Sequence, residues 1–127
     1  MDLFLKDATK HTPEIVFDLN SLSLVIKGFS IPEDILVFYA PLLEFIDTNN
    51  SRIRSNPNKL NITLNLEYYN SASLKFLLKL LGILLDIKDR EHTDINYYYD
   101  IDDEDFLETG EDISKLVNKK INFIART

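Results

Sequence analysis

One stretch of the sequence, residues 60–87, constrains the fold more than any other, because its apolar period changes halfway along. Its first part, LNITLNLEYYN, alternates apolar and polar residues, and this period of two predicts a half-buried strand. The inward side of that strand is expected to carry Leu60, Ile62, Leu64, Leu66 and Tyr68. The second part, SASLKFLLKLLGILLDI, is rich in leucine, and helical spacing separates its few polar residues and glycine, which are Lys75, Lys79, Gly82 and Asp86. The stretch therefore predicts a strand that leads directly into a helix.

A short polar junction, Asn70-Ser71-Ala72-Ser73, joins that strand to that helix. Asn and Ser are favoured as N-caps, because a short side-chain oxygen accepts a hydrogen bond from a free amide of the first turn. A phosphate on Ser71 would also be favoured here, since free amides and the helix dipole attract an anion. The local pattern leaves both interpretations of Ser71 open. Ser73 is the second choice as a phosphate acceptor, and Lys75 is close enough to help hold a phosphate.

The rest of the chain alternates strands and helices. Four further strands are expected, over residues 14–20, 23–29, 94–100 and 121–125, and the first two form a hairpin. Two further helices are expected, with Ser30 capping the first, over about 31–48 and 102–118. Residues 1–12 resemble a loose lead-in, and residues 49–58 resemble a flexible loop. The order ββαβαβαβ predicts one α/β domain over residues 1–127, with a mixed sheet packed by about three helices.

Composition excludes several classes of function. The chain has no cysteine, which rules out disulfides, thiolate catalysis and cysteine-bound zinc. A net charge of −7 argues against nucleic acid and against an anionic membrane surface as partners. We find no glycine-rich phosphate loop and no catalytic motif, so neither a cofactor nor an enzymatic activity is predicted. The N-terminal residues lack a signal-peptide pattern, and no apolar run is long enough to span a bilayer, so we expect a cytoplasmic protein.

An acidic run covers residues 100–112. The spacing of Asp100, Asp102, Glu104 and Glu111 resembles a calcium loop, but Asp105 stands where that loop needs glycine. The acidic start and the lysines further on also suit a helix. The favoured interpretation is therefore a solvated acidic surface that faces a partner, and a metal site is not predicted.

The leucine-rich helix has a wider apolar arc than one sheet face requires. Phe76, Leu80 and Ile83 flank the polar stripe on which Lys79 lies. Two interpretations remain open for this arc: neighbouring helices cover it, or it binds a partner beside Ser71. The candidate partner-binding residues are thus Phe76, Lys79, Leu80 and Ile83.

Four blocks of the sequence resemble a known family when taken together and in order. They are TPEIVFD (residues 12–18), SIPED (30–34), LEYYNSASLK (66–75) and YYDIDDEDFLETGED (98–112). In these blocks the chain resembles the SiaC family of bacterial regulatory phosphoproteins. The resemblance implies a fold similar to SpoIIAA-type (STAS-like) domains.

The resemblance also implies a non-enzymatic signalling switch. A SiaB-type protein kinase would phosphorylate the hydroxyl that follows the asparagine of the Y-x-N-[ST] pattern, which is Ser71, and a SiaA-type PP2C phosphatase would reverse the reaction. The unphosphorylated form would bind and activate a SiaD-type GGDEF diguanylate cyclase. Ala72 stands where relatives often carry a second hydroxyl, which leaves fewer alternative acceptors here. The alternative is an interaction or scaffold module that works without phosphorylation.

Overall fold

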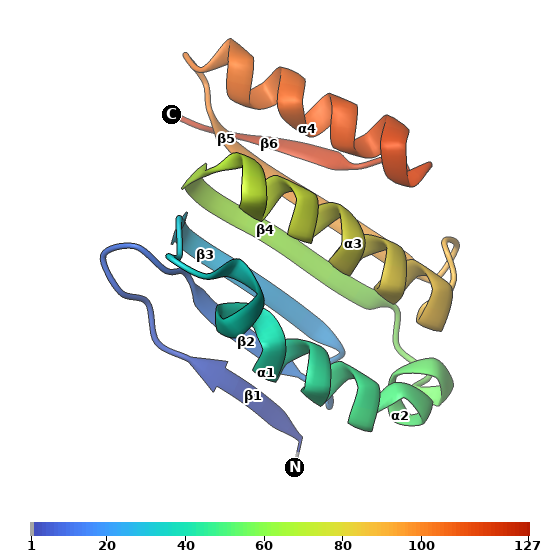
Figure 1. Ribbon diagram of the computed structural model, residues 1–127. Helices are drawn as coiled ribbons and strands as arrows, with labels where there is room; N and C mark the ends of the chain where they lie inside the picture. Colours follow the sequence, from blue (N-terminus) through green and yellow to red (C-terminus); the bar gives the residue numbers. More distant parts are fainter. Residues whose placement is uncertain (1) are drawn as a thin grey trace.

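The computed structural model describes residues 2–127 and shows a sheet with a layer of helices on one face (Figure 1). The sheet has six strands, which lie side by side in chain order. The strands are β1 (Leu3–Lys6), β2 (Glu14–Asp18), β3 (Ser23–Ser30), β4 (Leu60–Tyr69), β5 (Thr93–Asp100) and β6 (Asn122–Arg126). The helices are α1 (Ile35–Thr48), α2 (Asn50–Ser55), α3 (Ser71–Lys88) and α4 (Glu104–Val117).

The strand directions explain why the helices share one face. β1, β2 and β3 pair antiparallel, whereas β3, β4, β5 and β6 pair parallel. Each parallel connection moves to the next strand in the same direction, and a right-handed crossover then places its helix on the same side each time. Figure 1 shows α1, α3 and α4 on that side. The prediction of an α/β domain with a mixed sheet opened by a hairpin is confirmed.

The strand predicted from the period of two is β4. Leu60, Ile62, Leu64 and Leu66 are all buried, as expected. The prediction is wrong for Tyr68, which is 52% exposed. The pairing of β3 with β4 shifts register between Gly28 and Phe29, so one extra β4 residue changes the side on which the strand's last side chains lie. Tyr69 is buried in place of Tyr68.

Two segments predicted to be irregular are ordered elements. The lead-in contains β1, which pairs with β2, and Phe4 packs on Phe45 of α1 with ring centroids 5.6 Å apart. The loop at residues 49–58 contains α2, whose Ile53 is fully buried. Both elements are short, so the apolar pattern of each is too brief to stand out in the sequence. Their burial against distant parts of the chain decides their structure.

The start of α1 also differs from the prediction. The N-cap is Asp34, whose carboxylate accepts hydrogen bonds from the amides of Leu36 and Val37, both at 3.1 Å. Ser30, the expected cap, is the last residue of β3 and is buried. Instead of capping α1, the Ser30 hydroxyl lies within hydrogen-bonding distance of the Tyr39 and Ser73 hydroxyls.

Candidate functional site

Ser71 is the first residue of α3, directly after the end of β4. The N-cap is Asn70, whose side-chain oxygen accepts a hydrogen bond of 2.9 Å from the amide of Ser73. The interpretation of Ser71 as the cap is therefore wrong. The Ser71 side chain is exposed, and its hydroxyl makes no hydrogen bond to any residue in 2–127. Because the first amides of a helix lack partners within it, this hydroxyl lies beside free donors.

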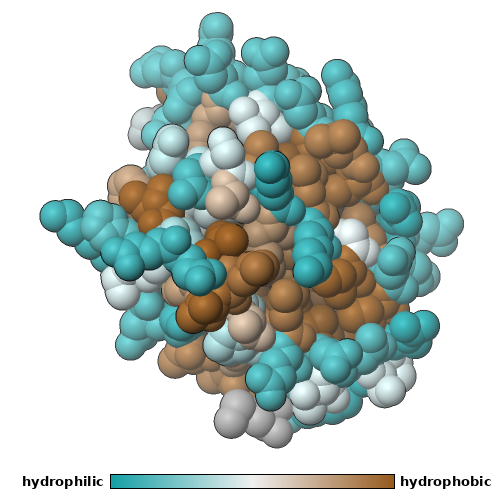
Figure 2. Space-filling view, in the orientation of Figure 1, coloured by the Kyte–Doolittle hydropathy of each residue, from teal (hydrophilic) through white to brown (hydrophobic). Residues whose placement is uncertain are grey.

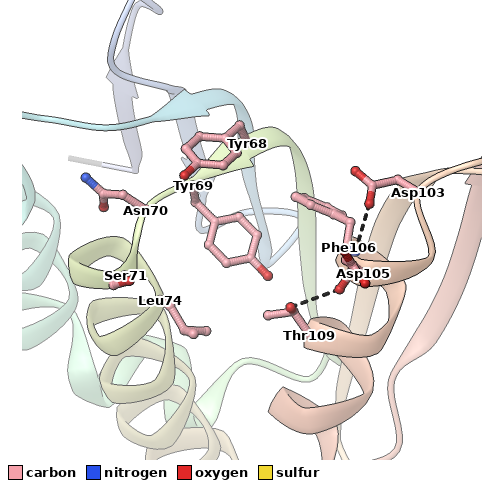
Figure 3. A pocket seen from close by; sticks show the side chains of 9 residues that line it. All are labelled: Tyr68, Tyr69, Asn70, Ser71, Leu74, Asp103, Asp105, Phe106 and Thr109. Carbon is pink, nitrogen blue, oxygen red and sulfur yellow. Dashed lines mark hydrogen bonds between the residues drawn. The ribbon is translucent and has the colours of Figure 1, made fainter.

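A pocket of about 290 Å³ opens beside Ser71 (Figure 3). It lies between the junction of β4 with α3 and the first turns of α4. Figure 3 shows Ser71 and Leu74 on the α3 side, and Asp105 and Thr109 on the α4 side. The other lining residues are Tyr68, Tyr69, Asn70, Asp103 and Phe106. The pocket thus combines aromatic rings with carboxylates from α4.

Two buried tyrosines, Tyr69 in the lining of this pocket and Tyr97 bonded to it, fix one side of the pocket. The hydroxyls of Tyr69 and Tyr97 lie 2.7 Å apart, and the Tyr97 hydroxyl donates a hydrogen bond of 2.7 Å to the carbonyl of Phe106. Burial raises the pKa of Tyr97 and of Tyr69, so both phenols stay protonated at neutral pH. The Phe106 ring meets Tyr69 edge-on, with centroids 5.2 Å apart. These contacts hold the start of α4 against the ends of β4 and β5.

Ser73 has a different environment from Ser71. It is fully buried, and its hydroxyl donates a hydrogen bond of 2.7 Å to the carbonyl of Ser30. The Ser30 hydroxyl lies 2.8 Å from the Ser73 hydroxyl and 2.7 Å from that of Tyr39. Burial raises the pKa of Tyr39 to about 12. Ser73, the second choice for phosphorylation, is therefore out of reach of a kinase in this conformation.

The predicted partner-binding residues separate into two pairs. Phe76 is only 5% exposed and stacks on Tyr39 with ring centroids 4.0 Å apart, while Leu80 is fully buried. Neither presents a surface to a partner in this conformation, and Tyr39 of α1 covers the Phe76 ring. Lys79 is exposed and Ile83 is half-buried, and both line the space between the two helices. The interpretation that neighbouring helices cover the arc holds for Phe76, and Leu80 is buried as well.

α1 carries exposed apolar residues that the sequence interpretation did not select. Leu36 is 65% exposed and Val37 is 71% exposed. The sequence could have indicated their exposure, because both lie outside the apolar stripe of α1 that faces the sheet. Lys75 of α3 is also exposed and lines a hollow together with Leu36.

The acidic run does not form a calcium loop. Glu104 begins α4, and the cap Asp103 accepts a hydrogen bond of 3.0 Å from the amide of Phe106. Asp100 ends β5 and pairs with Arg126 at 2.9 Å. Among residues 2–127, no three His, Cys, Asp or Glu side chains come together in an arrangement that could hold a metal ion. None of the helices in this part of the chain is long and apolar enough to cross a membrane.

Comparisons with known proteins give a family and a fold. The family model described as SiaC family regulatory phosphoprotein matches residues 6–126. The structure is similar to the crystal structure of apo-SiaC from Pseudomonas aeruginosa, with a TM-score of 0.79 and 20% identity over 100% of both chains. It is also similar to a chain in the crystal structure of the diguanylate cyclase SiaD in complex with its activator SiaC from that organism. That match has a TM-score of 0.78 and 21% identity, over 96% of this chain and 97% of that chain. No curated protein matches the sequence at a significant level.

Proposed function

Since the chain belongs to the SiaC family of regulatory phosphoproteins, we propose that it is a non-enzymatic switch controlled by phosphorylation of Ser71. In this proposal a SiaB-type kinase adds the phosphate and a SiaA-type PP2C phosphatase removes it. The unphosphorylated protein binds and activates a SiaD-type diguanylate cyclase in the cytoplasm. SiaC from Pseudomonas aeruginosa, whose fold this chain shares, is an activator that forms a complex with the cyclase SiaD.

The free hydroxyl of Ser71 is the observation that carries this proposal. The hydroxyl is exposed at the first residue of α3, and the cap is supplied by Asn70. Because it makes no hydrogen bond within the described chain, its modification breaks none there. The neighbouring hydroxyl of Ser73 is buried and bonded to Ser30, so modification of that residue would disrupt the core. The two serines of this junction are thus distinguished by accessibility.

Electrostatics predicts that a phosphate on Ser71 strongly weakens the binding of a partner at this end of α3. A phosphoserine adds about −1.5 to −2 charge at neutral pH. The pocket beside Ser71 already contains the carboxylates of Asp103 and Asp105, and the whole protein carries a net charge of −7. A partner that docks against this end of α3 would have to approach or bury the added dianion. A loss of about 2.7 kcal/mol corresponds to roughly a hundredfold weaker binding, which is enough for a switch.

Phosphopeptide mapping and binding measurements test the proposal together. The purified protein is incubated with ATP and its cognate SiaB-type kinase, and the phosphate is located by mass spectrometry. The affinity of the cognate cyclase is then measured for the unmodified and the phosphorylated protein. We expect the phosphate on Ser71, and binding at least thirtyfold weaker after phosphorylation.

Ser71→Ala is the control variant, because it removes only an exposed hydroxyl without a partner. It should bind the cyclase as the unmodified protein does and should accept no phosphate. A phosphate found on another residue would contradict the assignment of the site. Equal cyclase affinity before and after phosphorylation would instead favour an interaction module that works without phosphorylation.

A further inference from the structure

A groove runs between α1 and α3 and begins at the same end of α3 as Ser71. Its first hollow, of about 280 Å³, is lined by Ile35, Leu36, Ala72, Lys75, Phe76 and Lys79. Its second hollow, of about 360 Å³, continues toward the C-terminal end of α3 and includes Ile83 and Ile87. Lys79 lines both hollows, so the two lie next to each other along α3, and their lining residues define the groove.

We propose that this groove binds an amphipathic helix of the partner, with an apolar stripe in the two hollows and acidic residues facing Lys75 and Lys79. The proposal deepens the proposed function, since it names the chemistry of the partner segment and the way in which Ser71 controls it. Binding of a helix in the groove does not depend on the proposed function, and only the role given to phosphorylation rests on it.

The walls of the groove favour a helix as the occupant. Both walls are α-helices, whose backbone amides and carbonyls are paired within the helix except at the end turns, so they offer no continuous free edge to which an extended peptide could add. A segment in an apolar groove must then satisfy its own backbone, and a helix does so. From Ala72 to Ile87 the groove follows α3 for about 22 Å, which is the length of roughly four helical turns. Figure 2 shows hydrophobic side chains gathered over this helical face.

The charges at the rim favour acidic residues on that helix. The protein is acidic overall, with a net charge of −7, yet the first hollow has Lys75 and Lys79 at its rim and no acidic residue in its lining. The second hollow has one carboxylate, that of Asp47, at the other wall. A partner helix with glutamates on the flank toward α3 would meet both lysines. The exposed side chain of Leu36 offers apolar contact on the opposite flank.

Lys75 connects this groove to Ser71. The two residues are four apart on α3, and Lys79 is four further on, so all three lie on one face of the helix. A phosphate on Ser71 would be within reach of the Lys75 ammonium group, at a spacing that favours such pairs. Lys75 would then pair with the phosphate and no longer with the carboxylate of the partner. Phosphorylation would thereby withdraw one cation from the groove and add a dianion at its end.

Synthetic helices test the groove without a kinase or a cyclase. Two stapled 18-residue peptides share one leucine stripe, and the residues flanking the stripe are glutamate in the first peptide and lysine in the second. Each is titrated into the full chain, with binding measured by fluorescence anisotropy and the contact surface mapped by amide chemical shifts. We expect the glutamate peptide to bind at least tenfold more tightly than the lysine peptide, and the shifts to cluster on α1 and the facing side of α3. Lys75→Gln and Lys79→Gln should each weaken the glutamate peptide about fivefold.

Lys120→Gln is the matched control, because Lys120 is exposed and lies between α4 and β6, away from the groove. It should leave the affinity unchanged. Failure of both peptides to bind, equal affinity for the two, or shifts that map to α4 or to the uncovered sheet face would overturn the groove proposal. None of these outcomes depends on whether Ser71 is phosphorylated in the cell, so they are separable from a failure of the proposed function.

Phosphoserine placed at position 71 by genetic code expansion tests the role of Lys75. It should weaken the glutamate peptide at least tenfold in the otherwise unchanged protein. In the Lys75→Gln background the weakening should be smaller by at least a factor of three. An equal weakening in both backgrounds would refute the role of Lys75, while the groove itself would stand or fall on the unmodified protein.

Discussion

Replacement of Gly110 by alanine should destabilise the protein, whereas the same replacement at Gly82 should stabilise it. Both glycines lie inside helices, Gly82 in α3 and Gly110 in α4. A Cβ atom added at Gly110 would lie 2.6 Å from Cε1 and 2.8 Å from Cδ1 of Tyr97. A Cβ atom added at Gly82 would meet no heavy atom within 4 Å. The two variants therefore share the same gain in helix propensity and differ in one contact.

The magnitude follows from the fixed position of the Tyr97 ring. The ring is buried, and hydrogen bonds to Tyr69 and to the carbonyl of Phe106 hold its hydroxyl. Carbon atoms pack best at about 3.5–4.0 Å, so a contact at 2.6 Å forces the ring or α4 to move. Overpacking of this kind costs about 1–3 kcal/mol, and a ring held by hydrogen bonds places the cost near 3. Alanine gains about 1 kcal/mol over glycine in a helix. The net loss at Gly110 is then about 2 kcal/mol.

Urea unfolding and thermal melts of the two variants measure these free energies. For a chain of 127 residues the unfolding entropy at the midpoint is roughly 0.27 kcal/mol/K. Gly110→Ala should therefore lower the Tm by about 7 °C, and Gly82→Ala should raise it by about 4 °C. If Gly110→Ala proved as stable as the unmodified protein, the argument from a rigid ring would be refuted.

A double-mutant cycle with Tyr97→Leu attributes the loss to the ring. Leucine lacks the ring atoms that the new Cβ would meet, so the cost of Gly110→Ala should fall by about 2 kcal/mol or more in that background. A cost that stays the same in both backgrounds would show that the clash with Tyr97 is not its cause. The outcome matters for the candidate site, because Tyr97 and Phe106 hold the α4 wall of the pocket beside Ser71.

Two further predictions concern the start of α3 and the buried network beneath it. Asn70→Ala should lower the free energy of unfolding by about 1 kcal/mol in urea melts, because it removes the cap on the Ser73 amide. Ser71→Ala should change the free energy of unfolding by less than about 0.5 kcal/mol. Equal losses in the two variants would contradict the assignment of Asn70 as the cap. Burial raises the pKa of Tyr39 to about 12 in the folded state, whereas it is about 10 in the unfolded chain. The stability that the neutral phenol contributes is therefore intact below pH 10 and is lost as the pH rises from about 10 to 12. Tyr39→Phe should therefore reduce the fall in stability between pH 9 and pH 11 in urea melts, and a fall as large as that of the unmodified protein would contradict the role of Tyr39.

Local patterns in the sequence were sufficient for the order of the main elements. The change of period within residues 60–87 correctly predicted β4 followed by α3, and the hairpin of β2 with β3 followed from the short turn between them. These signals are readable because each depends on residues a few positions apart. They also predicted the junction at which Ser71 lies, although the structure shows that Asn70, and not Ser71, caps α3.

Contacts between distant residues decided the rest. Ser71 and Ser73 look alike in the sequence, but Ser73 is enclosed by Ser30, which is 43 residues away, and by Tyr39. The register shift opposite Gly28 exchanged the sides of Tyr68 and Tyr69, and no pattern within β4 could reveal it. In the same way, the burial of Phe76 depends on where α1 packs, because its ring stacks on Tyr39.

The sequence by itself determined the fold class, the strand-to-helix junction and the resemblance to a family of phosphoproteins, because periodicity, capping and short motifs act between near neighbours. Only the tertiary structure decided which serine hydroxyl faces solvent and which apolar side chains of α3 are covered. Burial is a property of packing between elements far apart in the chain, so it becomes known only when those elements are brought together.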